Sequence, residues 1–133
     1  FGDEVVVYRI EGNRAVSVEP GGPEAAREAA AIREEPAYGN MAELGLGVLG
    51  GLGVEPVGEL LLDEKLGVHI AFGRSDHFGG RVGPGDFSRP EAVIHLDRVY
   101  VPAMQPRIRL VSADLVAPGG RVTPLVRDDA WVV

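Results

Sequence analysis

The side chains best suited to chemistry are the three histidines and the carboxylates that lie near them in the chain. The sequence contains three His and no Cys, so imidazole or transition-metal chemistry must use His69, His77 or His95. The lack of Cys excludes thiolate zinc sites, cysteine nucleophiles and disulfides. The positions of the histidines are therefore the most informative chemical signal in the chain.

His95 and Asp97 form the clearest candidate pair. They belong to the run IHLD, which is apolar enough to form a strand, and residues i and i+2 of a strand project from the same face. An imidazole nitrogen beside a carboxylate oxygen offers two ligands to a divalent metal. The alternatives are a hydrogen bond that orients the imidazole, or two exposed residues on a half-buried strand.

Two further candidates lie in apolar surroundings. Glu43 is the only carboxylate in the Gly-rich run MAELGLGVLGGLGV, and a buried carboxylate requires a partner. Strand alternation would place it with Met41 and Gly45, facing either a cation or solvent. His69 follows Val68 in another apolar run, where it is either a hydrogen-bonded core residue or a ligand.

Asp76 and His77 begin a Gly-rich loop, a place where functional side chains are often displayed. We interpret these two as catalytic candidates. Taken together, imidazoles and carboxylates without thiolates suit Zn, Co or Mn in a hydrolytic site. A dinuclear site would also need a bridging carboxylate and an activated water.

The elements that must position these residues are mainly strands. Two β-prone runs flank Gly12-Asn13, and two more, at residues 108–116 and 121–126, flank a Pro-Gly-Gly turn. Each pair predicts an antiparallel hairpin. Residues 92–101 predict a further strand that carries His95 and Asp97.

One helix is clear and a second is open. Pro23 suits a first helical position, and residues 23–35 have helical spacing of their Ala and Ile side chains until Pro36 ends the pattern. Glu24, Arg27 and Glu28 predict a solvated outer face. Residues 62–72 read either as a second helix capped by Asp63 or as a strand from Val68. The overall expectation is an α+β fold, mostly antiparallel strands and hairpins.

Composition narrows the class of protein. The chain has 133 residues, 45% hydrophobic and 25% charged, with a net charge of −7. This length predicts a single domain, residues 1–133. The acidic balance argues against a nucleic-acid partner or an anionic membrane surface. No apolar run is long enough to span a bilayer and no signal sequence opens the chain, so we expect a cytoplasmic protein without a membrane partner.

Four segments in this order carry a family resemblance: NMAELGLG at residues 40–47, LLLDEKLGVHIAFG at 60–73, FGG at 78–80 and IHLD at 94–97. Together they resemble the C-terminal part of the aminopeptidase T-like family of thermophilic metalloproteases, closest to its leucyl aminopeptidase-like branch. The resemblance implies a dinuclear metal centre that activates water to remove the N-terminal residue of a peptide substrate.

The resemblance also implies roles for individual residues. Glu43, His69, His95 and Asp97 occupy positions that are metal ligands in the family. The family has a tyrosine ligand seven residues after the first His, where this chain has Asp76, followed by His77. Asp76 could replace that tyrosine as an oxygen ligand, which would put both residues at the edge of the site.

The remaining expectations concern what lies outside the chain. The family's other glutamate ligand comes from an N-terminal domain that would precede Phe1, so we expect this chain to be the C-terminal half and inactive in isolation. A homo-oligomer or that N-terminal domain is the expected protein partner. The alternative is a degenerate, non-catalytic domain that serves self-association or binds a small ligand.

Overall fold

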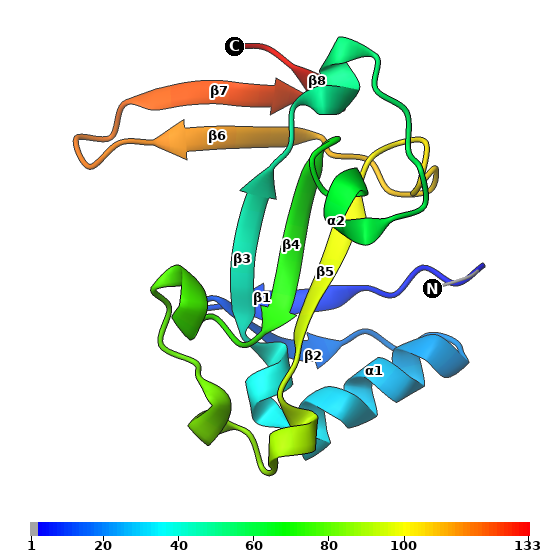
Figure 1. The fold of residues 1–133 in the computed structure, drawn as a ribbon, viewed down its shortest axis with the longest axis vertical. Coiled ribbons are helices and arrows are strands. Elements are labelled where there is room, and N and C mark those ends of the chain that lie inside the picture. Colours follow the sequence, from blue (N-terminus) through cyan, green and yellow to red (C-terminus); the bar gives the residue numbers. More distant parts are fainter. Residues whose placement is uncertain (1–2) are drawn as a thin grey trace. The chain divides into compact units, whose positions relative to one another are not determined.

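A computed structural model describes residues 3–133 and confirms the α+β class (Figure 1). The elements, in chain order, are β1 (Tyr8–Glu11), β2 (Arg14–Val18), α1 (Pro23–Glu34), β3 (Met41–Leu46), α2 (Leu60–Asp63), β4 (Val68–Gly73), β5 (His95–Tyr100), β6 (Ser112–Val116), β7 (Val122–Arg127) and β8 (Ala130–Trp131). Short 3-10 turns join several of them. The described strands form sheets of order β1-β2, β3-β4-β5 and β6-β7-β8.

The sequence predicts one domain, and the structure divides into two compact units. The first unit contains the chain up to Leu44 together with Ile70–Asp97, and the second contains Gly45–His69 and Arg98–Val133. No helix within residues 3–133 is long and apolar enough to cross a membrane.

Both predicted hairpins are present. In the first, β1 pairs antiparallel with β2 around Gly12 and Asn13, whose φ angles are 54° and 64°. Two consecutive positive φ values define a type I′ turn, which matches the twist of paired strands and favours Asn and Gly. In the second, β6 pairs with β7, and Gly120 takes the positive φ of 79° that this turn requires.

Helix α1 confirms the predicted start at Pro23 and ends just before Pro36. Its first turn is capped from outside the helix, because Gly22 has no side chain to accept a hydrogen bond. The carboxylate of Glu4 accepts hydrogen bonds from the backbone N–H groups of Glu24 (3.0 Å) and Ala25 (2.9 Å). This contact anchors the N-terminal segment to the helix and places negative charge at its positive end.

The prediction of a solvated outer face on α1 is wrong for Glu28. Glu24 and Arg27 do form a surface ion pair of 2.5 Å. Glu28, however, is 5% exposed, and its Oε2 accepts hydrogen bonds of 2.6 Å from the hydroxyls of Tyr8 and Tyr38. Helical spacing could not reveal this, because both donors come from other elements.

A helix over residues 62–72 is also wrong. Helix α2 stops at Asp63, and strand β4 begins at Val68, which matches the alternative of a strand. Asp63 does not cap the start of a helix: its two carboxylate oxygens accept hydrogen bonds from the backbone N–H groups of Val57 (2.9 Å) and Gly58 (2.8 Å). The β-branched Val68 and Ile70 favour the pleated conformation.

Each unit has its own small core. In the first, Phe72 is 1% exposed, and its ring centroid lies 5.1 Å from that of Tyr8 and 6.1 Å from that of Tyr38. In the second, Leu66, Val99 and Val101 are buried together, with Met104 packed against them. These cores hold the strands whose polar side chains form the candidate site.

Candidate metal centre

Three predicted ligands of the first unit come together. Glu43 lies on β3, and His95 and Asp97 lie two residues apart on β5. Each offers a ligand atom, and these atoms all lie within 4.8 Å of one another. The i, i+2 spacing of strand β5 therefore projects His95 and Asp97 side by side as predicted, and Glu43 joins them from a separate strand.

A hydrogen bond to the backbone fixes the orientation of the His95 ring. Its Nδ1 lies 2.8 Å from the backbone carbonyl oxygen of Arg74. A carbonyl oxygen can only accept a hydrogen bond, so Nδ1 carries the hydrogen and donates it. In the neutral ring, Nε2 then presents a lone pair. This is how metal-binding histidines are oriented in proteins, with the second nitrogen bonded to a carbonyl or carboxylate.

That lone pair faces two carboxylates. Nε2 of His95 lies 3.2 Å from Oε2 of Glu43 and 3.6 Å from Oδ1 of Asp97. The side chains of His95, Glu43 and Asp97 are 20%, 24% and 11% exposed, so water screens them only partly. Lone pairs at this separation repel unless a proton or a metal cation lies between them.

Asp97 adds an independent sign that a ligand is needed. Its Oδ1 is buried and has no hydrogen-bond partner among the residues that the structure describes. The great majority of buried polar atoms have such a partner, and an exception calls for a bound ion, a water or a strained site. The donor set, one imidazole and two carboxylates, fits a divalent cation in both charge and atom type.

Asp76 and His77 lie at the rim of this group, on a 3-10 turn at Asp76–Phe78. The rings of His77 and His95 meet edge to face with centroids 4.8 Å apart, and the ring of Phe78 lies 5.6 Å from that of His95. The side chain of His77 is 37% exposed. A partly exposed imidazole thus lies directly beside the His95 ring.

Asp76 is held by Arg74 and is not part of the ligand group in the described chain. The guanidinium Nε of Arg74 lies 2.5 Å from Oδ1 of Asp76. The hydrogen bond from Arg74 and its positive charge, with a smaller contribution from His77, lower the pKa of Asp76 against a modest desolvation effect. Asp76 is therefore an ionised carboxylate that restrains Arg74, whose carbonyl in turn orients His95.

The loop that carries Asp76 and His77 is held in place by hydrogen bonds and close backbone packing. The amide of Asn40 donates to the carbonyl of Gly73 (2.8 Å), and the N–H of Ser75 donates to the carbonyl of Val82 (2.8 Å). Gly73 has a φ of 102°, and a Cβ there would lie 2.3 Å from the carbonyl oxygen of Ile94. Only glycine fits at this position, which brings Arg74 beside the start of β5.

His69, the remaining predicted ligand, belongs to the second unit. It is 4% exposed. Its ring lies directly against Gly45: a Cβ at that glycine would lie 1.9 Å from Cε1 and 2.1 Å from Nε2 of His69. The absence of a side chain at Gly45 is therefore what makes room for a buried imidazole on β4.

Two residues of this region were not predicted. Arg74 acts on His95 through its carbonyl, which every residue possesses, so no sequence signal could identify it. Phe78 is 62% exposed and its ring lies beside that of His95. The sequence placed it in the FGG segment of the resemblance but gave it no role.

Comparison with known proteins adds no assignment. No protein-family model matches the chain, no curated protein matches it in sequence, and no solved structure matches it in fold. The resemblance of its motifs to aminopeptidase T-like enzymes stays a prediction, and the chemistry has to be argued from the site itself.

Proposed function

We propose that Glu43, His95 and Asp97 bind a divalent metal ion and that the chain is the metal-binding part of a hydrolase. One observation carries the proposal: the hydrogen bond from Nδ1 of His95 to Arg74 turns Nε2 toward two carboxylate oxygens. A cation between these three atoms relieves the repulsion of their lone pairs and supplies the partner that Asp97 Oδ1 otherwise needs.

The ligand types narrow the metal. Imidazole with carboxylate and no thiolate suits Zn²⁺, Co²⁺ or Mn²⁺, whereas Ca²⁺ and Mg²⁺ prefer all-oxygen sites. A proton on Nε2 would also relieve the repulsion, so binding of the metal must be measured in competition with protons. We expect affinity to fall as the pH is lowered, because the ligands must be deprotonated to bind.

The surroundings favour hydrolysis. A divalent metal ion bound here would polarise a carbonyl and lower the pKa of a bound water toward neutrality. His77 is half-exposed beside His95 and is placed to accept or return a proton as a general base or acid. Phe78 offers an apolar surface next to it for a substrate side chain. The motif resemblance supports an N-terminal peptide bond as the bond that is cleaved.

Metal binding tests the first half of the proposal. Protein stripped of metal by chelator is titrated with Co²⁺ and with Zn²⁺, using the visible absorption of bound Co²⁺ and calorimetry. We expect one ion per chain at the lowest free metal concentrations. Replacing the ligands, as in Glu43→Gln, His95→Ala or Asp97→Asn, should weaken binding at least tenfold, as is typical when metal-site contacts are lost.

The matched control is Glu59→Gln. Glu59 is exposed and lies in the second unit, so its loss of charge should leave metal affinity unchanged. Equal affinity in the wild type and all three ligand variants would contradict the site.

Hydrolysis tests the second half. Aminoacyl-anilide cleavage is assayed with the chain alone and joined to the N-terminal domain that the resemblance calls for. Activity should require the added metal and fall on His77→Gln with metal affinity retained. If metal binds stoichiometrically and no aminoacyl substrate is cleaved in either form, the chain is a metal-binding domain without this activity.

A further inference from the structure

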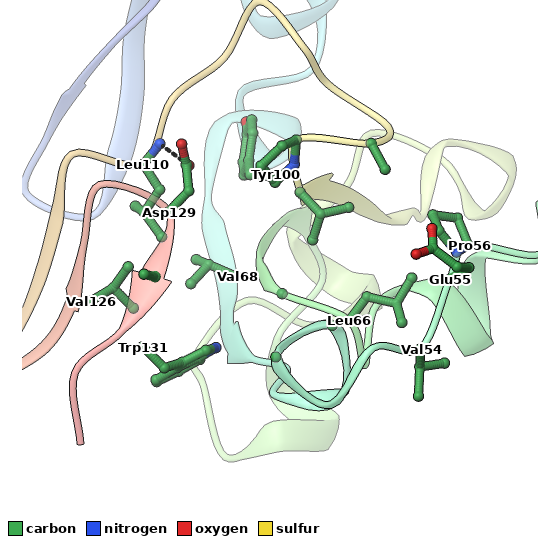
Figure 2. Close-up of a pocket in the computed structure, with 17 residues that line it drawn as sticks. Val54, Glu55, Pro56, Leu66, Val68, Tyr100, Leu110, Val126, Asp129 and Trp131 are labelled. Atoms are coloured by element: carbon green, nitrogen blue, oxygen red, sulfur yellow. Dashed lines mark hydrogen bonds between the residues drawn. The ribbon is translucent and has the colours of Figure 1, made fainter.

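The second unit contains a cavity that the metal centre does not use. Its volume is about 550 Å³, within the usual range for small-molecule sites. All the residues that line it belong to the second unit. Figure 2 shows Val126 and Trp131 on one side, with Leu66, Glu55 and Pro56 on the other. Apolar side chains thus make up most of the wall.

The charged groups of the cavity have one sign. Glu55 and Asp129 are the only charged side chains that line it within the described chain, and no Lys, Arg or His lies in its wall. Asp129 is fixed in place, because its Oδ1 accepts a hydrogen bond of 2.8 Å from the backbone N–H of Leu110. Two carboxylates at the border of an apolar cavity favour a cation and repel an anion.

Two aromatic residues reinforce this preference. Trp131 and Tyr100 both line the cavity, and the faces of their rings attract cations, that of Trp most strongly. Burial raises the pKa of Tyr100, only partly offset by the nearby charge of Arg98, so its phenol stays neutral. The ring of Tyr100 is therefore partly withdrawn from water at the wall of the cavity.

The walls are preformed. Gly50 donates its N–H to the carbonyl of Leu66 at 3.1 Å, and a Cβ on Gly50 would lie 2.5 Å from that oxygen. The turn that leads into Trp131 has two consecutive non-glycine residues with positive φ, Asp128 at 50° and Asp129 at 65°. This is the two-residue type I′ turn that joins β7 to β8, and it fixes the place of Asp129 and Trp131 in the wall.

We propose that this cavity binds a small hydrophobic amine in its ammonium form, of the arylalkylammonium class. The apolar wall takes the hydrocarbon part, while Glu55, Asp129 and the face of Trp131 stabilise the charged end. The proposal does not rest on the metal centre, and neither depends on the outcome of the other.

Trp131 provides a direct readout, because it is the only Trp in the chain. The whole chain is titrated with phenethylammonium while the fluorescence of this residue is followed. The matched probes are 2-phenylethanol, which lacks the charge, and 3-phenylpropionate, which carries the opposite charge. We expect saturable binding of the amine, about fivefold weaker binding of the alcohol, as expected for one exposed charge pair, and weaker binding still of the carboxylate.

Glu55→Gln removes one negative charge while the side chain keeps its size and shape. It should weaken the amine about fivefold and leave the alcohol unchanged, since an exposed ion pair has this magnitude. Glu59→Gln is the matched control, because this exposed residue does not line the cavity. In Trp131→Leu, calorimetry should show weaker binding of all three probes, with the largest loss for the amine.

Three outcomes would overturn the proposal. One is equal affinity for all three probes, which would leave an unselective apolar cavity. Another is fluorescence that changes with protein concentration alone and not with amine, together with a dimer in sedimentation, which would identify a second copy as the occupant. The third is no saturable change in either fluorescence or calorimetry.

Discussion

Buried carboxylates in the two units have opposite surroundings. Asp63, in the second unit, is 1% exposed, and each of its oxygens accepts a backbone N–H. Asp97, in the first unit, has an 11% exposed side chain whose Oδ1 is buried beside an imidazole nitrogen, with no hydrogen-bond donor among the described residues. The hydrogen-bonding capacity of Asp63 is used within the fold, whereas Oδ1 of Asp97 lacks a donor among the described residues and so indicates a place for a ligand.

Glu28 shows that the difference does not depend on the unit. It lies in the first unit and is also buried, at 5% exposure, and two tyrosine hydroxyls donate to it. What sets the candidate metal centre apart from Asp63 and Glu28 is therefore that Oδ1 of Asp97 has no hydrogen-bond donor among the described residues. Isosteric replacement of a carboxylate by an amide should separate the two kinds of site.

The largest effect is expected from Asp63→Asn. An amide nitrogen cannot accept a hydrogen bond, so one of the N–H groups of Val57 and Gly58 would lose its partner and face another donor. We expect the free energy of unfolding to fall by about 3 kcal/mol, measured by urea denaturation. Glu59→Gln, four positions earlier and exposed, should change it by less than about 0.5 kcal/mol. Similar small losses in both variants would show that Asp63 does not stabilise the 57–58 segment.

A smaller loss is expected from Glu28→Gln. The amide oxygen can still accept from both tyrosines, but both hydrogen bonds lose the strength that a charged acceptor gives them. We expect a loss of about 2 kcal/mol, read from the same denaturation curves. Tyr8→Phe and Tyr38→Phe should each account for part of it, and the losses should not add, because the hydroxyls share one oxygen. Full additivity would argue that the two hydroxyls act independently.

The fold was predictable where local rules dominate. Gly12-Asn13 specifies its turn type through the positive φ angles that these residues tolerate, and Pro23 and Pro36 bound α1 because of their fixed φ and missing N–H. At residues 62–72 the sequence left a helix and a strand from Val68 open, and the structure has the strand. The prediction was wrong at Glu28. In both places the decisive contacts are ones that periodicity does not reveal. They are the N–H groups of Val57 and Gly58, six and five residues before Asp63, and the hydroxyls of Tyr8 and Tyr38, 20 and 10 residues from Glu28.

The candidate site was partly predictable for the same reason. Strand periodicity placed His95 and Asp97 side by side. The approach of Glu43 depends on the pairing of separate strands, which spacing alone does not specify. The orientation of the His95 ring depends on the carbonyl of Arg74, and Arg74 in turn is engaged by Asp76, which the sequence suggested as a catalytic candidate or an oxygen ligand.

At the candidate metal centre, the same replacement of a carboxylate by an amide should have little effect on the free energy of unfolding. In metal-free protein, Asp97→Asn gives His95 Nε2 an amide donor in place of a carboxylate, so we expect the free energy of unfolding to change by less than about 1 kcal/mol. Saturating metal should instead stabilise the wild type by about 2.7 kcal/mol at a hundredfold excess over its Kd, and Asp97→Asn by at most about 1.4 kcal/mol at the same metal concentration, because its affinity is at least tenfold lower. A loss in metal-free Asp97→Asn as large as that of Asp63→Asn would remove the contrast between the two sites.

The smallest effect is expected at Glu4, a partly exposed carboxylate that accepts hydrogen bonds from two backbone N–H groups. The hydrogen bonds from the N–H groups of Ala25 and Glu24 lower its pKa from the ordinary value of 4.5, in spite of some desolvation. A lowered folded-state pKa means that its stabilising effect is complete above pH 4.5 and is lost as the pH falls through the folded-state value. Glu4→Gln should therefore lower Tm at neutral pH and converge with the wild type in acid. The control is Glu19→Gln at an exposed position, whose Tm should follow that of the wild type at every pH. If the Tm of Glu4→Gln lies below that of the wild type by the same amount at all pH values, the contact of Glu4 with α1 acts through shape and not through charge.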